Sequence, residues 1–132
     1  MYLYPMMLPC LFIAPSENRG RGVFTAEPLS GNLVVEISPV LVVSPDERAL
    51  LEQTRLHDYI FEWGVDGKEV CVAWGYLSMY NHAAIPNCRY EMDFTHQLIS
   101  IYTLRDIAAG EELFINYLPD EGDQPPIWFD AK

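Results

Sequence analysis

The sequence predicts a single, mainly β domain spanning residues 1–132, with one or two short helices, and three observations support this. The chain has 132 residues, which suits one hydrophobic core, since domains commonly contain about 100–150 residues. Half of the residues are hydrophobic and 13% are aromatic, which argues against a disordered chain. Short apolar runs alternate with frequent turn residues, a pattern typical of many short strands. We expect a core at about residues 11–117 and a C-terminal tail at 118–132.

The N-terminal third is predicted to consist of short strands. Residues 11–14 and 23–26 favour extended structure, and residues 15–22 between them, with Pro, Asn and two Gly, are expected to form a loop. Residues 33–43 are rich in Val, Ile and Leu but contain Pro39, which has no N–H to donate. We therefore expect either two short strands or one strand with an edge break there.

A helix is predicted to follow. Ser44 can cap it, Pro45 suits its first position, and Glu47 completes a capping box. We expect the helix to continue to about Thr54. Its apolar face would be supplied by Ala49, Leu50 and Leu51.

The rest of the chain is predicted to contain further strands. Asp66 and Gly67 are typical of a hairpin turn, and further turns are expected at residues 86–87 and 109–110. The strands are expected at residues 59–63, 69–73, 89–94, 98–104 and 112–117. Residues 74–81 are compatible with a short helix or an irregular segment.

The charge of the chain restricts its partners. Eight Lys and Arg residues against 19 Asp and Glu residues give a net charge of −11. Such a balance argues against direct binding to nucleic acid, whose phosphates need cations, and against anionic membrane surfaces. It suits a Lys- or Arg-rich protein segment, although solubility alone would also explain it.

The cysteines indicate a reducing environment. Cys10, Cys71 and Cys88 are odd in number and widely spaced, so they form neither a disulfide framework nor a CxxC zinc site. We expect them to be buried small hydrophobes in an intracellular protein, cytoplasmic or nuclear. Residues 1–14 are apolar but contain two prolines and no Lys or Arg, so no secretory signal is expected.

Three polar motifs could carry chemistry, although each is weak alone. Gly20-Arg21-Gly22 could approach a ligand or form an ordinary tight turn. His82, next to Asn81, could be a base or a structural histidine. A metal site is not expected, because no carboxylate or second His lies at helical ligand spacing from it. Near the end of the predicted core, Tyr117 could be a positioned hydroxyl or a core aromatic.

Read together and in order, these motifs resemble the SET domain of protein-lysine methyltransferases. The resemblance rests on RGRGVF at 19–24, NHAAIPNC at 81–88, RDIAAGEEL at 105–113 and NY at 116–117, with Gly75-Tyr76 shortly before the Asn-His pair. It covers roughly residues 11–117 and is closest to small stand-alone members without zinc-binding pre-SET or post-SET modules. The resemblance implies a β-clip of several small sheets and a pseudoknot-like C-terminal segment. That segment would bring Asn81-His82 and Asn116-Tyr117 together.

The resemblance also implies a site for S-adenosyl-L-methionine on one face, with the target lysine entering from the other. The catalytic residue would be Tyr117. The cofactor-binding residues would be Arg19, Gly20, Arg21, Gly22, Asn81, His82 and Tyr117. The substrate channel would be formed by Tyr76, Tyr80, Ile115 and Trp128. No metal is implied.

The sequence departs from the family pattern at several positions. Ala83 stands where Ser is common after the Asn-His pair, which removes one hydrogen bond. Ile115 occupies a position that is Phe or Tyr in many members and influences the number of methyl groups added, so that number is left open. Trp128 and Phe129 could replace the absent C-terminal module by folding over the cofactor, or could simply anchor the tail.

The predicted function is S-adenosylmethionine-dependent methyl transfer to the side-chain amine of a lysine in a basic protein or peptide. In-line transfer from a sulfonium needs alignment and exclusion of water, which supply up to about 7–11 kcal/mol. Neither step needs a metal. Two alternatives are a catalytically inactive SET-like module that binds a peptide or partner, and a structural β domain whose motifs are coincidental. A homodimer that completes the substrate groove is left open.

Overall fold

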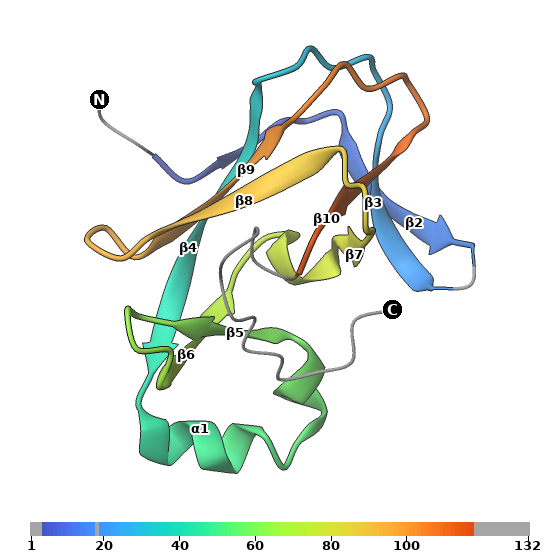
Figure 1. Ribbon diagram of the computed structural model, residues 1–132. Coiled ribbons are helices and arrows are strands. Elements are labelled where there is room, and N and C mark those ends of the chain that lie inside the picture. The colour runs from blue at the N-terminus through green and yellow to red at the C-terminus, as the bar shows by residue number, and fades with distance from the viewer. Residues whose placement is uncertain (1–3, 18, 118–132) are drawn as a thin grey trace.

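The computed structural model describes residues 4–17 and 19–117 (Figure 1). The mainly β class is confirmed: this part of the chain contains ten strands, one α-helix and two short 3₁₀ helices. The strands form two curved sheets that share one hydrophobic core, to which residues of both sheets contribute. Its fully buried members include Val23, Val35, Ile99, Ile101 and Leu113.

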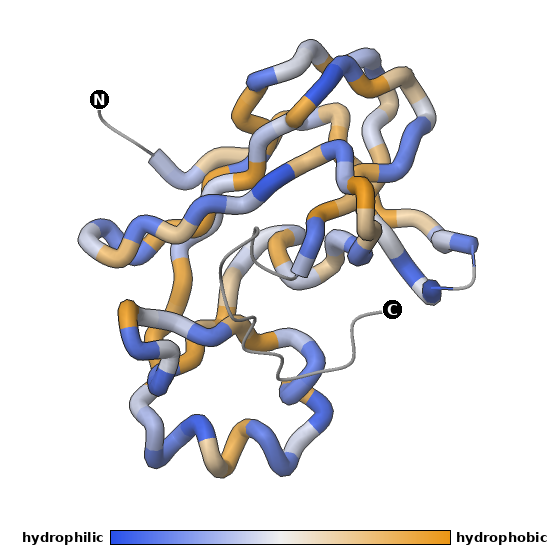
Figure 2. The backbone as a smooth tube through the Cα atoms, viewed as in Figure 1, coloured by the Kyte–Doolittle hydropathy of each residue, from blue (hydrophilic) through white to orange (hydrophobic). Residues whose placement is uncertain are grey.

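The larger sheet has the strand order β5-β6-β4-β9-β8, and β1 also pairs with β4. Its strands are β1 (Met6–Met7), β4 (Val34–Val43), β5 (Ile60–Trp63), β6 (Glu69–Ala73), β8 (Cys88–Asp93) and β9 (Leu98–Thr103). Hydrophobic colouring marks the C-terminal half of β4, which runs through the middle of this sheet (Figure 2).

Pro39 does not break β4, which is a single strand of ten residues. Along one edge, β4 pairs first with β1 and then, from Val40 onward, with β6. Pro39 lies between these two partners, where its missing N–H interrupts neither ladder. One continuous strand with a change of partner therefore replaces the two short strands that were one of the sequence alternatives.

The smaller sheet has the order β2-β3-β10-β7. Its strands are β2 (Leu11–Ser16), β3 (Gly20–Thr25), β7 (Asn81–His82) and β10 (Glu112–Ile115). Strands β2 and β3 form a hairpin whose ladder extends to Ser16 and Gly20, so the loop predicted for residues 15–22 is wrong in extent. Gly20 has a φ of +73°, a conformation that suits glycine at the start of β3.

The α-helix α1 (Pro45–Leu51) begins as predicted and ends three residues before Thr54. The Ser44 side chain accepts a hydrogen bond from the Glu47 N–H at 3.3 Å, which confirms the cap. Beyond the helix, Thr54 caps the 3₁₀ helix η1 (Arg55–Asp58), because its hydroxyl accepts from the Leu56 N–H. The predicted apolar face is wrong at two positions: Ala49 and Leu50 are exposed, and only Leu51 packs against buried residues.

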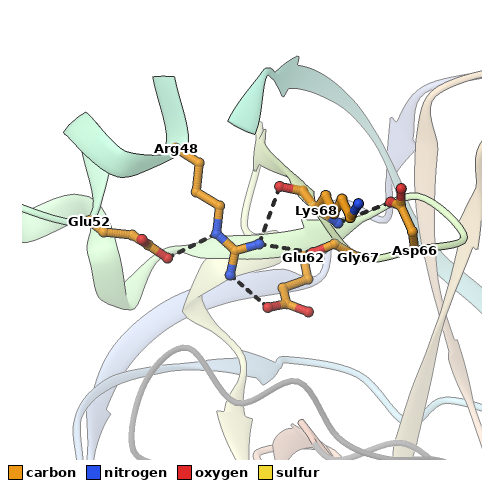
Figure 3. Close-up of polar contacts among 6 residues, drawn as sticks. All are labelled: Arg48, Glu52, Glu62, Asp66, Gly67 and Lys68. Atoms are coloured by element: carbon orange, nitrogen blue, oxygen red, sulfur yellow. Dashed lines mark hydrogen bonds and ion pairs between the residues drawn. The ribbon is translucent and has the colours of Figure 1, made fainter. Parts of the chain in front are cut away.

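Arg48 fastens α1 to the hairpin of β5 and β6 (Figure 3). Its guanidinium donates to Glu52 at 2.9 Å, to Glu62 at 2.6 Å and to the Gly67 carbonyl at 2.8 Å. A small apolar cluster of Val43, Ile60 and Val70 lies in the same unit. The expected turn at Asp66-Gly67 and the expected strand at residues 69–73 are both present.

The cysteines are free thiols. Cys71 and Cys88 are fully buried, as predicted, whereas Cys10 is only half-buried. Burial raises the pKa of both Cys71 and Cys88 to about 12, so neither is a thiolate nucleophile at neutral pH. Within residues 4–17 and 19–117, no helix is long and apolar enough to cross a membrane.

Candidate active site

A cavity of about 470 Å³ opens between the smaller sheet, η1 and the 3₁₀ helix η2 (Leu77–Met79). Four separate stretches of the chain supply its walls. The lining residues are Arg19, Gly20, Arg21, Asp58, Tyr59, Ser78, Met79, Asn81, His82 and Tyr117. Three motifs that lie far apart in the sequence therefore meet in one cavity.

Strand pairing brings two of these motifs together. β10 lies between β3, with which it is antiparallel, and β7, with which it is parallel (Figure 1). Phe114 is opposite Asn81 in the parallel pair, and Ile115 is opposite His82. Because β10 ends at Ile115, the chain leaves the sheet beside His82 and places Tyr117 against it.

The Asn87 side chain hydrogen-bonds to the backbone of β10, as a neighbouring strand would. Its side chain is buried, and its amide donates to the Glu112 carbonyl at 2.8 Å while its oxygen accepts from the Phe114 N–H at 2.7 Å. Such a pair of bonds satisfies two backbone groups that would otherwise lack a partner. The sequence indicated only a turn at this position.

Glu112 connects three parts of the smaller sheet. Its carboxylate accepts hydrogen bonds from the Ser16 hydroxyl at 2.7 Å and from the Asn81 amide at 2.8 Å. The same amide group donates to the Arg21 carbonyl at 3.1 Å. A Cβ atom on Gly22 would overlap the Glu112 carboxylate and lie 2.8 Å from the Asn81 amide nitrogen. Gly22 is therefore required by this network, although it does not line the cavity.

His82 is positioned as a hydrogen-bond acceptor. Its Nδ1 accepts from the Tyr117 backbone N–H at 3.0 Å, and the centroids of the two rings are 5.1 Å apart. Burial and the nearby Arg19 charge lower the pKa of His82 below its ordinary value of 6.5. The neutral imidazole is the form that can accept this bond, so the electrostatics and the geometry agree.

Tyr117 presents a protonated hydroxyl. The hydroxyl donates to the Tyr80 carbonyl at 2.7 Å. Burial raises the pKa of Tyr117 to about 12, with Arg19 acting in the opposite direction and Glu112 in the same one. At neutral pH Tyr117 is therefore a hydrogen-bonding group and not a base.

The cavity is locally basic in an acidic chain. Arg19 and Arg21 both line it, and among the described residues that line it Asp58 is the only carboxylate. The Arg19 guanidinium donates to the His82 carbonyl and lies 5.2 Å from the centroid of the Phe114 ring. These contacts fix one positive charge at the cavity wall, where an anionic group of a ligand would be attracted.

Comparison with known proteins decides the family. The SET domain profile matches residues 20–118 of the chain. The chain belongs to the SET domain family.

Two relatives agree with this assignment. The chain is 40% identical over 129 residues to a histone-lysine N-methyltransferase, H3 lysine-37 specific, of Schizosaccharomyces pombe, covering 97% of this chain and 82% of that protein. A crystal structure of a candidate histone methyltransferase from Plasmodium falciparum superposes with a TM-score of 0.68 at 26% identity, covering 89% of this chain and all of that one. The predicted SET fold and the enzyme class, protein-lysine N-methyltransferase, are confirmed. Neither comparison favours the inactive module.

The cofactor-binding residues expected from the SET resemblance are gathered at the cavity, with one exception. Six of them line it, namely Arg19, Gly20, Arg21, Asn81, His82 and Tyr117, while Gly22 lies behind. None of the described residues forms a cluster of His, Cys, Asp or Glu suited to a metal ion.

Three of the residues expected in the substrate channel do not line this cavity. Tyr80 and Ile115 are buried in the core, with exposed fractions of 1% and 0%, and Tyr76 packs against that core. None of the three lines the cavity. Ile115 is on the inward face of β10, whereas Tyr76 and Tyr80 flank η2, with Tyr80 in the core and Tyr76 packed against it. Trp128 lies outside the described residues.

Sequence reasoning missed four residues of the cavity wall. They are Asp58, Tyr59, Ser78 and Met79. Ser78 and Met79 precede the Asn-His motif closely enough to have been considered. Asp58 and Tyr59 carry no local signal, because they reach the cavity only through the packing of η1 and β5.

Proposed function

We propose that this SET domain transfers methyl groups from S-adenosyl-L-methionine to the side-chain amine of a lysine in a basic protein segment. The observation that carries the proposal is the single cavity shared by residues 19–21, Asn81-His82 and Tyr117. A reaction that depends on alignment needs such convergence of rigid groups more than it needs an acid–base pair.

The cavity fits the cofactor in size and chemistry. Its volume of about 470 Å³ falls within the roughly 300–1,000 Å³ of small-molecule sites. Arg19 and Arg21 would pair with the methionine carboxylate. At Gly20 a Cβ would meet nothing within 4 Å, so the backbone has open space beside it. Asn81 and His82 would hold the adenine side, and the bound cofactor would supply an electrophilic methyl group on sulfur.

The lining residues suit the transfer of a methyl group to a neutral amine. Lysine has an ordinary pKa of about 10.4, so deprotonation at pH 7 costs about 4–5 kcal/mol. Aromatic walls lower this cost by desolvating the ammonium form, and Tyr59 and Tyr117 are the tyrosines of the cavity. The His82 Nδ1 already accepts a hydrogen bond, and the Tyr117 hydroxyl is protonated, so neither group is available as a base. The lysine ammonium group therefore loses its proton to solvent before the amine reacts.

The proposed substrate is a lysine-rich histone segment. The net charge of −11 attracts a basic partner and speeds its encounter. Asp58 offers a carboxylate at the cavity for the incoming ammonium group. The relative of Schizosaccharomyces pombe acts on lysine 37 of histone H3, and 40% identity makes H3 the first substrate to test. Action on a histone would also agree with the expected intracellular location.

Calorimetry and mass spectrometry test the proposal. We expect saturable binding of S-adenosylmethionine by the purified chain. After incubation of histone H3 with methyl-deuterated cofactor, we also expect its lysines to gain mass in steps of about 17 Da. Each step corresponds to one proton replaced by a trideuteromethyl group. Absence of cofactor binding would overturn the proposal. Binding without transfer to any basic protein would support the binding module instead.

A further inference from the structure

A buried carboxylate lies behind the cavity and belongs to none of its walls. Glu36 is on β4 and is only 1% exposed. One carboxylate oxygen accepts from the Tyr76 backbone N–H at 2.8 Å, and the other accepts from the Tyr80 hydroxyl at 2.8 Å. Glu36 therefore binds both ends of the segment from Tyr76 to Tyr80.

This segment supports the reacting part of the cavity. Its members Ser78 and Met79 line the cavity, and Asn81 follows directly. The Tyr80 carbonyl accepts the Tyr117 hydroxyl bond at 2.7 Å. A continuous chain of hydrogen bonds and covalent structure thus runs from Glu36 through Tyr80 to Tyr117.

We propose that Glu36 is a positioning residue for methyl transfer, because it fixes the Tyr80 carbonyl that receives the Tyr117 hydroxyl. The inference rests on the proposed function and adds a residue that touches neither cofactor nor substrate. Small displacements in a reaction controlled by alignment are costly, and a shift of about 1 Å can reduce the rate by about a hundredfold.

Stability alone is a poor reason for this carboxylate. Burying a charged group is expensive, and well-packed apolar residues of similar volume are often as stable or more so. Burial raises the pKa of Glu36, and the bonds from Tyr80 and Tyr76 only partly oppose this. Gly75 leaves room for the Glu36 carboxylate: its φ is +74°, and a Cβ at this position would overlap that carboxylate.

Conservative variants separate positioning from folding. Glu36→Gln keeps the size of the side chain, but its single amide oxygen can accept from the Tyr80 hydroxyl or from the Tyr76 N–H and not from both. Tyr80→Phe removes the hydroxyl and keeps the ring. We expect each variant to lower kcat about tenfold, equivalent to about 1.4 kcal/mol, with the cofactor Kd nearly unchanged. The double variant should be slower than either single one by less than the product of the two losses, because both changes weaken the same attachment of the Tyr76–Tyr80 segment to residue 36.

Thr103→Val is the matched control. Thr103 is also buried and polar, and it bonds the Ser30 carbonyl at 2.6 Å and the Leu33 N–H at 2.9 Å. It does not line the cavity, so its loss should lower Tm and leave kcat unchanged.

Two results would overturn the proposal. One is a folded Glu36→Gln or Tyr80→Phe protein with the kcat of the active wild type. The other is a crystal structure of Glu36→Gln in which the Tyr80 carbonyl and Tyr117 hydroxyl keep their place. The second result holds whether or not the wild type methylates lysine. A wild type without cofactor binding would instead contradict the proposed function.

Discussion

The two walls of the cavity are held in place differently. In the first wall, polar side chains that hydrogen-bond to the backbone join β3, β7 and β10. The second wall comes from a unit made of α1, η1, β5 and β6. The first region is fixed by Asn87, Glu112 and Asn81, each with two or more hydrogen bonds. The second contributes Asp58 and Tyr59 to the cavity. It is held through the pairing of β6 with β4, the Arg48 contacts, and buried apolar residues of β5 and β6 that belong to the shared core and to the cluster of Val43, Ile60 and Val70.

This difference separates two tasks. The proposed catalytic and cofactor-binding groups sit in the region where several hydrogen bonds determine each position. The residues proposed to meet the substrate, Asp58 and Tyr59, lie at η1, which like α1 contains no buried residue. Such elements are the kind that open locally at lower cost. Substitutions in the first region should therefore change kcat and cofactor binding, and those in the second should change local stability and the substrate KM.

The largest expected effect is that of Tyr117→Phe. The variant loses the hydroxyl bond to Tyr80 but keeps the backbone bond to His82, so the cavity wall survives. We expect kcat to fall by about a hundredfold or more, which corresponds to about 2.7 kcal/mol, while cofactor affinity is retained. Single-turnover rates and calorimetry measure the two quantities. Tyr102→Phe is the control, since its hydroxyl contacts Glu91 on the larger sheet; equal rates in both variants would remove Tyr117 from the mechanism.

Gly22→Ala should weaken cofactor binding about tenfold, or about 1.4 kcal/mol. The added methyl would displace Glu112 and Asn81, which together place the wall near Arg21. Gly31→Ala is the matched control, because its Cβ would be no closer than 3.4 Å to the Arg105 backbone. Calorimetry of both variants decides the point, and unchanged affinity in Gly22→Ala would show that the network does not position the cofactor.

The acid limb of activity and stability should depend on His82. Its pKa is lowered in the folded protein, so the native state binds fewer protons than the unfolded state. The stabilisation is complete above pH 6.5 and is lost as the pH falls through the folded pKa. Both Tm and kcat should therefore decline below that pH, and kcat should rise toward alkaline pH as the lysine amine loses its proton.

Variants of two histidines check this assignment. His82→Gln should abolish the loss of Tm near pH 6, whatever its activity, and leave the loss at lower pH that comes from carboxylates such as Asp93 and Glu111. His96→Gln changes an exposed residue that contacts Asp93 and should keep the loss of Tm near pH 6. An unaltered acid limb in His82→Gln would assign the titration to another group.

The smallest effect on catalysis is expected from Arg48→Ala. Loss of its bonds to Glu62, Glu52 and the Gly67 carbonyl should lower the free energy of unfolding by about 1–2 kcal/mol. We expect kcat to remain and the KM for a peptide to rise, because Asp58 and Tyr59 belong to the same unit. Arg48→Lys keeps the charge without the planar fork and should be intermediate. A large loss of kcat would show that the two regions are not separate.

The sequence determined the features that depend on neighbouring residues. The Ser44 cap, the Asp66-Gly67 hairpin and the bounds of β6 followed from capping and turn chemistry, which act within a few positions. The motif order was also sufficient to predict the SET fold and the residues 19–21, 81–82 and 117 that meet at the cavity.

Only the tertiary structure decided the features that depend on distant partners. Pro39 is tolerated within β4 because, along one edge of this strand, the pairing with β1 ends before Pro39 and the pairing with β6 begins after it. The Tyr80 hydroxyl donates to Glu36, which is 44 positions away, and the Tyr80 carbonyl accepts from the Tyr117 hydroxyl, which is 37 positions away. Tyr59 reaches the cavity through packing of a unit that carries no motif. Local chemistry sets backbone conformation, but the direction in which a buried polar side chain points is set by whichever distant donor or acceptor satisfies it.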